Sequence, residues 1–218
     1  MLAAANQGTM TRGTTKQVKQ VKQVKQVKQV TTGDTRRGFW QELLELAGFG
    51  KGAELRTRVF QHFADSLPVR PQPGAAEPYA RQVLHQGSAG EVMLAGWALG
   101  GCSAPHDHGE ASGFVLVLEG RFSESVYRFD GRELERVAQR ELGVREFTRA
   151  RAGVIHDLHA ADAGLTLHFY TPAIVAMRVY DVERRTTLLV TGDGGAWIPR
   201  GGAGAGEAVA WATVADPC

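Results

Sequence analysis

The chain has 218 residues, of which 43% are hydrophobic and 22% charged. This composition excludes a collagen-like or wholly disordered chain and predicts one folded domain. No apolar run reaches about 18 residues, and residues 1–13 lack the apolar stretch of a secretory signal, so we expect a cytoplasmic protein without a membrane partner. Cys102 and Cys218 are too few for a disulfide framework, and we expect Cys102 to be a small buried residue.

The positive charge is concentrated at the N-terminus. Residues 1–37 carry eight Lys or Arg against one Asp, which leaves 17 basic and 22 acidic residues in the remainder. Residues 16–30 are five copies of Lys-Gln-Val, a period that fits neither a helix nor a strand. We predict that residues 1–37 form a disordered basic low-complexity extension. A tether to nucleic acid or membrane is the alternative, although the acidic remainder argues against a nucleic-acid partner.

Residues 37–67 have the pattern of two short amphipathic helices. Apolar residues recur there at helical spacing in two groups, separated by Gly48-Phe49-Gly50. Four prolines between residues 68 and 78 then favour an extended connection. The apolar groups are Phe39, Leu43, Leu44 and Leu46, followed by Leu55, Val59, Phe60 and Phe63.

From residue 79 onward, short apolar runs alternate with glycine-containing turns. Runs at 91–97, 113–118, 123–129, 147–149, 165–170 and 177–179 are predicted strands. Asp130-Gly131, between 126–129 and 134–137, indicates a hairpin turn. Many short strands without intervening helices predict a mainly β fold of the jelly-roll barrel type with short N-terminal helices. We expect residues 38–218 to form this single domain, with an unassigned Gly-rich tail over 193–206.

Histidines at alternating positions are the strongest candidates for chemistry. His106 and His108 are two residues apart, so on a strand both imidazoles would point to one side and could bind one ion. The alternative is a pair of histidines on a polar face. Gly153-Val154-Ile155-His156 places a third imidazole on another predicted strand, whereas His159, the competing ligand, would face the opposite way. Three neutral imidazoles would leave a divalent ion its full charge and open positions for substrate.

These two blocks resemble the two motifs of the cupin superfamily. The first block is in register with its motif, whereas the second matches only through its glycine and histidine. Where many cupins place a Glu ligand, this chain has Gly113. The matching positions are Gly100, His106, His108 and Gly120 in the first motif and Gly153 and His156 in the second.

Over residues 39–182 the chain resembles the thiol dioxygenases of the cysteine dioxygenase type I family. The resemblance rests on Tyr79-Ala80-Arg81, Trp97, Pro105-His106-Asp107-His108, and Leu165-Thr166-Leu167-His168-Phe169-Tyr170-Thr171-Pro172. It implies Fe(II) held by His106, His108 and His156, and oxidation of L-cysteine with O2 to cysteine sulfinic acid. Animal members carry a Cys that crosslinks to the catalytic Tyr. Gly113 occupies that position here, so we expect no crosslink.

The resemblance also implies roles for the residues around the iron. Thr166, His168 and Tyr170 alternate along one predicted strand, so hydroxyl, imidazole and phenol would bond in series and orient a catalytic Tyr170. A buried polar network that serves only stability is the alternative.

Arg81 would bind the substrate carboxylate because a guanidinium offers a planar charged fork. Tyr79 would support it, and Trp97 and Met177 would form apolar walls. At the position of Arg81, a Gln is typical of relatives that prefer 3-mercaptopropionate. Gln82 adjoins Arg81, so a shift of one residue in the match would change the assignment. A 3-mercaptopropionate or broader thiol dioxygenase, and a non-catalytic metal- or ligand-binding cupin, are therefore alternatives. We expect a monomer whose partners are L-cysteine and O2.

Overall fold

The computed structural model describes residues 35–75, 77–191, 195–197 and 205–212. All of the described residues belong to one compact unit. The Lys-Gln-Val repeat and most of the Gly-rich tail lie outside the described residues. Helix α1 begins at Thr35, inside the extension that we expected to reach residue 37.

Two helices precede the strands, as the apolar spacing predicted. They are α1 (Thr35–Gly48) and α2 (Gly52–His62). The short connection between them contains Gly50, whose φ of +71° lies in the left-handed region that favours glycine. In the part of the chain that the structure describes, neither helix is long and apolar enough to cross a membrane.

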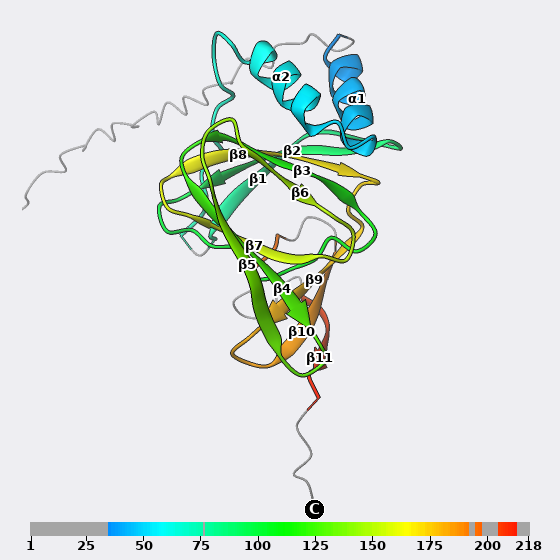
Figure 1. The fold of residues 1–218 in the computed structure, drawn as a ribbon, viewed down its shortest axis with the longest axis vertical. Helices are drawn as coiled ribbons and strands as arrows, with labels where there is room; N and C mark the ends of the chain where they lie inside the picture. The colour runs from blue at the N-terminus through cyan, green and yellow to red at the C-terminus, as the bar shows by residue number, and fades with distance from the viewer. Residues whose placement is uncertain (1–34, 76, 192–194, 198–204, 213–218) are drawn as a thin grey trace, which may run out of the picture. The chain divides into compact units, whose positions relative to one another are not determined.

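The strands form three antiparallel sheets (Figure 1). The largest has the order β1-β2-β8-β3-β6, and the smaller ones are β5-β4-β7 and β11-β10-β9. The strands are β1 (Tyr79–Gly87), β2 (Gly90–Trp97), β3 (Ser112–Glu119), β4 (Phe122–Phe129), β5 (Leu134–Leu142), β6 (Phe147–Ala150), β7 (Ile155–Ala160), β8 (Gly164–Thr171), β9 (Ala176–Asp181), β10 (Thr186–Thr191) and β11 (Ala205–Ala210).

The two smaller sheets are joined by the segment that carries the first histidine pair. Isolated bridges connect Cys102 to His159 of β7, and His106 to both His156 of β7 and Val179 of β9. The segment thus occupies the place of a strand between β7 and β9, so that the smaller sheets together face the larger one. This arrangement confirms the mainly β jelly-roll barrel of the cupin type.

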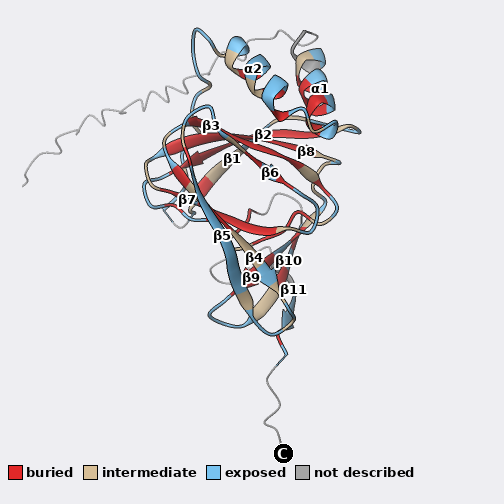
Figure 2. Cartoon of the chain, in the orientation of Figure 1, coloured by how far each residue is buried: buried red, intermediate tan, exposed pale blue. Residues whose placement is uncertain are grey.

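The helices cover the outer face of the five-stranded sheet (Figure 1). Leu43 and Leu44 of α1, with Leu55 of α2, pack against Leu167 and Phe169 of β8. Figure 2 shows β2, β3 and β8 buried along nearly their whole length, whereas β5 is almost entirely exposed. The central strands therefore have a second, inward face that is also shielded from water, and this face carries part of the candidate site.

The predicted strands are all present, and the hairpin at Asp130-Gly131 is confirmed between β4 and β5. The Asp130 carboxylate accepts hydrogen bonds from the backbone N–H groups of Arg132 and Glu133, both at 2.8 Å. Strands β1, β10 and β11 were not among the predicted runs. Strand β1 precedes the first of these runs, β10 falls between the last predicted strand and the Gly-rich tail, and β11 includes the end of that tail.

Candidate metal centre

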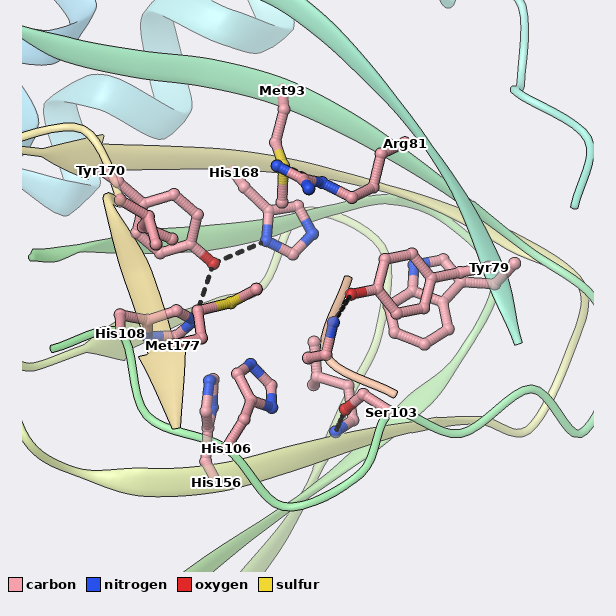
Figure 3. A pocket seen from close by; sticks show the side chains of 14 residues that line it. Tyr79, Arg81, Met93, Ser103, His106, His108, His156, His168, Tyr170 and Met177 are labelled. Carbon is pink, nitrogen blue, oxygen red and sulfur yellow. Dashed lines mark hydrogen bonds between the residues drawn. The ribbon is translucent and has the colours of Figure 1, made fainter. Parts of the chain in front are cut away.

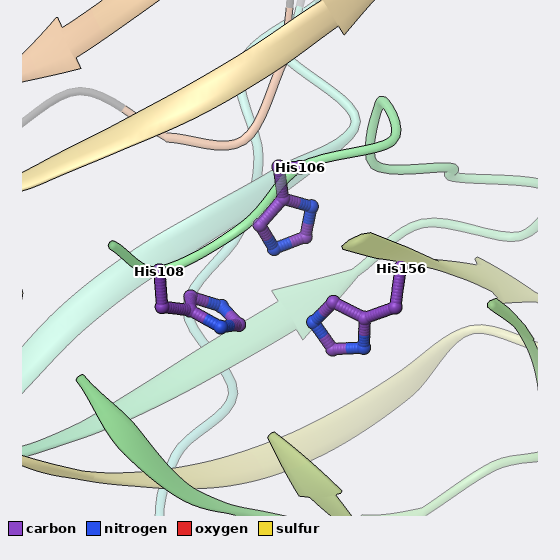
Figure 4. Close-up of side chains that lie close together, drawn as sticks. All are labelled: His106, His108 and His156. Carbon is purple, nitrogen blue, oxygen red and sulfur yellow. The ribbon is translucent and has the colours of Figure 1, made fainter. Parts of the chain in front are cut away.

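Three histidines from two distant parts of the chain converge inside the barrel (Figure 4). The ring centroids of His106 and His108 are 4.8 Å apart, those of His106 and His156 4.8 Å, and those of His108 and His156 5.0 Å. One ring nitrogen from each lies within 4.8 Å of the other two, and all three side chains are buried. His159 is exposed on the opposite face of β7.

The histidine pair does not lie on a strand, contrary to our expectation. Only His106 forms bridges, with backbone hydrogen bonds of 2.9 Å in both directions to His156. Pro105 has no N–H to donate, although its carbonyl accepts from Tyr180 at 2.8 Å. The segment is nevertheless extended between its two neighbours, which keeps His106 and His108 on one side.

Asp107 anchors the histidine pair from behind. Its carboxylate accepts hydrogen bonds from Arg178 Nε at 2.8 Å, from the Gly109 N–H at 2.9 Å and from the Tyr180 hydroxyl at 3.3 Å. The residue is fully buried although Arg178 is half-exposed. Sequence reasoning missed this role, although the alternation of side chains that brings the two histidines together also turns Asp107 away from them.

The imidazoles are prepared to donate lone pairs to a cation. His106 Nδ1–H donates to the Ala104 carbonyl at 2.9 Å and His156 Nδ1–H donates to Glu124 Oε1 at 2.8 Å, which leaves both Nε2 atoms unprotonated. Within the described part of the chain, His156 Nε2 and His108 Nδ1 are buried without a hydrogen-bond partner. Such orphaned nitrogens require an explanation, and a coordinated ion supplies one.

Electrostatics agrees with this interpretation. Burial, followed by the neighbouring His156, lowers the pKa of His106 to about 3. Burial also holds the pKa of His108 well below its usual value. Both rings are therefore neutral near pH 7, the form that binds metals. The residues present fit a divalent ion such as iron, nickel or zinc, for which imidazole is a suitable ligand.

A chain of hydrogen bonds runs along the inner face of β8 to the histidine cluster. Trp97 Nε1–H donates to Thr166 Oγ1 at 2.8 Å, and this hydroxyl lies 2.8 Å from His168 Nε2 but 3.5 Å from its alternative acceptor, a backbone carbonyl. His168 Nδ1–H then donates to the Tyr170 oxygen at 3.0 Å. The Tyr170 hydroxyl proton is therefore not used by His168, and the hydroxyl oxygen lies 3.2 Å from His108 Nε2.

The protonation states in this chain are set by burial. It lowers the pKa of His168 to about 3 and raises the pKa of Tyr170 above its usual value. A neutral imidazole and a neutral phenol therefore alternate as acceptor and donor. The arrangement leaves the Tyr170 O–H free to donate outside the chain of hydrogen bonds.

A cavity adjoins the histidines (Figure 3), with about 400 Å³ not filled by atoms, including the part open to solvent. Arg81 of β1 is half-buried in its wall, with Nε 3.3 Å from Met93 Sδ, whereas Gln82 is exposed. In Figure 3, Arg81 and Met93 lie on the side away from His106 and His156. Trp97 and Met177 also line the cavity, as expected of apolar walls.

Tyr79 lines the cavity as well, but its hydroxyl has a partner that the sequence did not predict. It accepts a hydrogen bond of 2.7 Å from the Ala196 N–H, and the ring stacks on Trp97 with centroids 4.4 Å apart. This contact attaches the segment 195–197 to the cavity wall. The charge of Arg81 lies close enough to oppose the rise in the Tyr79 pKa that burial causes.

Two buried carboxylates near the cavity were not anticipated. Glu124 contacts the outer side of the His156 ring. Glu91 is paired with Tyr170 across β2 and β8, and its Oε1 has no hydrogen-bond partner among the described residues. Burial raises the pKa of Glu91, an effect that the nearby charge of Arg81 opposes. Neither residue stands in a recognisable motif, so only the alternation of β2 and β4 could have indicated them.

The structure locates Cys102 and also Gly113, the position at which animal relatives carry the crosslinking Cys. Cys102, expected to be buried, is exposed, because it lies in the irregular segment before His106 rather than inside the barrel. Gly113 of β3 is paired directly with Tyr170 of β8. A Cβ atom at Gly113 would overlap the carbonyl oxygen of Phe169, which accounts for glycine at this position.

Comparison with solved structures gives weak likenesses. KdgF from a Halomonas species is 17% identical, over 47% of this chain and 88% of that one, with a TM-score of 0.39. An uncharacterised conserved protein with a double-stranded β-helix domain from Klebsiella pneumoniae is 14% identical, over 53% and 93%, with a TM-score of 0.44. Recombinant oxalate oxidase in complex with glycolate is 16% identical, over 46% and 53%, with a TM-score of 0.38.

Comparison with protein families is more informative. The family described as cysteine dioxygenase type I matches residues 75–184, a range that contains all three histidines, Arg81 and Tyr170. This range is about half of the chain. The chain therefore belongs to the cysteine dioxygenase type I family and is a cupin-type, metal-dependent enzyme.

Proposed function

We propose that the protein is an Fe(II)-dependent thiol dioxygenase that oxidises L-cysteine with O2 to cysteine sulfinic acid. One observation carries the proposal: a cluster of three buried imidazoles shares a single cavity with the guanidinium of Arg81. The first group would hold the iron, and the second would hold the carboxylate of an amino-acid substrate.

Iron would be bound by His106, His108 and His156. When bound, it would lower the pKa of a coordinating thiol and supply the redox chemistry by which O2 adds to sulfur. Both oxygen atoms end on the sulfur, which loses the electrons that O2 gains, and the thiol proton is retained by the sulfinic acid. The reaction therefore needs no flavin, nicotinamide or external reductant.

The residues of the chain would position the substrate. Arg81 remains charged at any physiological pH and can form paired hydrogen bonds with a carboxylate. Its place beside Met93, at the side of the cavity away from His106 and His156, supports an extended substrate with its thiol toward the histidines and its carboxylate toward Arg81. Trp97 and Met177 would exclude water from the space between, and Tyr79 would support the carboxylate end.

Tyr170 would serve as the hydrogen-bond donor at the reacting end. Its hydroxyl already contacts His108, and His168 with Thr166 hold it so that its proton faces the cluster. During the reaction we propose that this proton is offered to the substrate or to oxygen, since a phenol with a raised pKa remains protonated until a stronger base approaches. Tyr170 is thus the proposed catalytic residue, and His168 and Thr166 are positioning residues.

The remaining expectations stay part of this proposal. We propose that residues 38–218 act as a single catalytic domain and as a monomer in the cytoplasm, with no nucleic acid or membrane partner. The basic residues before position 37 would be dispensable for catalysis. Deletion of residues 1–34 should leave thiol-dependent O2 uptake unchanged.

Metal analysis combined with an oxygen electrode tests the function. Purified protein should contain about one iron per chain and take up O2 with L-cysteine, giving cysteine sulfinic acid as product. Preference for 3-mercaptopropionate would mean that Arg81 does not select the substrate and that the chain is a broader thiol dioxygenase. Iron-free protein that shows no thiol-dependent uptake after anaerobic loading with Fe(II) would rule out the enzyme and leave a binding cupin.

Substitution of Arg81 tests the substrate assignment. Arg81→Gln should raise KM for L-cysteine by roughly tenfold to a hundredfold, because one charged hydrogen-bonded pair is lost, while iron content stays the same. Arg128→Gln, which removes an exposed guanidinium on β4, is the matched control and should change neither. Equal KM values in R81Q and the parent protein would contradict the carboxylate assignment.

A further inference from the structure

A buried polar cluster lies on the outer side of His156, away from the cavity. Its centre is Glu124 of β4, which is only 2% exposed. In the strand register Glu124 stands opposite Arg140 of β5 on one side and opposite Leu158 of β7, two residues beyond His156, on the other. Because side chains alternate along a strand, His156 and Leu158 point to the same face of β7 as the one that Glu124 faces. The carboxylate can therefore reach the histidine diagonally and the arginine directly.

The Glu124 carboxylate is fully bonded. Oε1 accepts from His156 Nδ1–H at 2.8 Å, and the hydroxyl of Thr148 lies 2.8 Å from both oxygens. Oε2 also accepts from Arg140 Nε at 2.7 Å, and Arg140 Nη2 donates to Thr148. Four side chains, one each from β4, β5, β6 and β7, thus hold one another. These contacts fix the position of the His156 ring.

The three histidines differ in what holds them. The Nδ1–H of His106 donates to a neutral backbone carbonyl, and the Nδ1 of His108 has no partner among the described residues. Within that part of the chain, only His156 has a carboxylate on its far side. Among the described residues, this cluster of buried imidazoles has no carboxylate ligand of its own. Glu124 therefore places a negative charge directly behind one of the three proposed ligands.

We propose that Glu124 is a positioning residue that sets the affinity of the three-histidine centre for its divalent ion. The inference rests on the proposed metal centre. A carboxylate behind an imidazole fixes the tautomer with an unprotonated Nε2, holds the ring plane and raises the basicity of the donor nitrogen. His156 Nε2, buried and otherwise unpartnered, is the atom that gains from all three effects.

Arg140 links this cluster to the protein surface. Its side chain is half-exposed, and it lines a second hollow together with Glu124, Thr148 and the back of His156. Its positive charge holds the carboxylate in place but also offsets part of the negative charge that reaches His156. Loss of Arg140 should therefore weaken ion binding less than loss of the carboxylate itself.

Titration of the metal-free protein with Co(II), followed by its visible absorption bands, tests the inference. Glu124→Gln keeps the size of the side chain and should weaken Co(II) binding by about tenfold to a hundredfold. Arg140→Gln should weaken it by a smaller factor. The matched control is Glu135→Gln on β5, an exposed carboxylate paired only with Arg128, which should change nothing.

A second readout separates positioning from general support of the fold. The increase in melting temperature on adding Co(II) should shrink in E124Q, beyond any change in the melting temperature of the metal-free protein. If E124Q does not fold, Thr148→Val decides, because it removes one hydrogen bond to the carboxylate and should weaken binding severalfold.

The outcomes are distinct. Co(II) affinity within threefold of the parent protein in a folded E124Q, or in T148V if E124Q is unfolded, would overturn the role of Glu124. Failure of the parent protein itself to bind Co(II) through histidine would overturn the metal centre, and with it the proposed function.

Discussion

The central strands β2, β3 and β8 present two buried faces that differ in chemistry. On the outer face, Val92, Leu94 and Leu167 pack against the helices in an apolar layer. On the inner face, Met93 of β2 is paired with His168 of β8. Each of them is the direct neighbour in sequence of an outer-face residue, Leu94 and Leu167. The further inner-face residues of β2 and β8 are Glu91, Ala95, Trp97, Thr166 and Tyr170.

The difference shows how one set of strands separates stability from chemistry. Both faces are shielded from water, so a polar group on either face must find a partner within the protein. The fully buried side chains of the outer face are apolar and need no such partner. On the inner face, Trp97, Thr166, His168 and Tyr170 are bonded in series, and a proton is left for a ligand at the end of that series. A substitution on each face should therefore change a different property.

The largest effect on activity should come from His156→Ala. Loss of one of three ligands should abolish iron binding and reduce thiol-dependent O2 uptake to background. Glu124 keeps its bonds to Thr148 and Arg140 in this variant, so the metal-free protein should remain folded. Iron content, O2 uptake and circular dichroism measure the three properties. His159→Ala, three residues along on the exposed face of β7, is the control and should retain full iron content.

The largest effect on stability should come from the outer face. Leu167→Ala removes a fully buried side chain beneath the helices and should lower the free energy of unfolding by about 2–5 kcal/mol. Chemical denaturation measures this loss. Below the melting temperature, kcat/KM per bound iron should stay within about twofold. A large loss of activity in a folded L167A would show that the two faces are not independent.

Most of the fold was accessible from the sequence because its signals are local. Apolar spacing before residue 67 indicated the two helices, and the apolar runs of β2, β3 and β8 indicated buried strands. Strand β10 (Thr186–Thr191) was missed although it is rich in Thr, Leu and Val and is followed in the sequence by Gly192-Asp193-Gly194, a pattern typical of a strand and turn. The segment containing His106 was expected to be a strand. Pro105 has no N–H to donate, and the segment pairs with β7 on one side and β9 on the other through isolated bridges. The local sequence does not indicate either neighbour.

The site was predictable only where a motif names its residues. Spacing and family resemblance together indicated the three histidines, Arg81 and Tyr170. Asp107 and Glu124 were not predicted because their partners, Arg178 and His156, are 71 and 32 residues away in the chain. Buried carboxylates that hold metal ligands in place have no local signature. The sequence alone does not distinguish them from other acidic residues at inward strand positions, because their partners are distant in the chain.

A smaller effect, confined to catalysis, is expected for Tyr170→Phe. Removal of the hydroxyl eliminates the proton donor at the end of the inner-face series, and kcat/KM for L-cysteine should fall on the order of a hundredfold, equivalent to about 2.7 kcal/mol. Iron content should not change, because the acceptors that hold the Nδ1–H groups of His106 and His156 are left in place. Activity within threefold of the parent protein would show that the series serves only stability.

The smallest effect should come from the beginning of the same series. Thr166→Val removes the hydroxyl between Trp97 and His168 without changing the volume, so His168 is free to adopt either tautomer. We expect kcat/KM to fall about tenfold, equivalent to about 1.4 kcal/mol, because Tyr170 then directs its proton correctly only part of the time. Thr166→Ser retains the hydroxyl and should restore nearly full activity despite losing a buried methyl group. Equal activities of T166V and T166S would mean that the inner face acts by packing, as the outer face does.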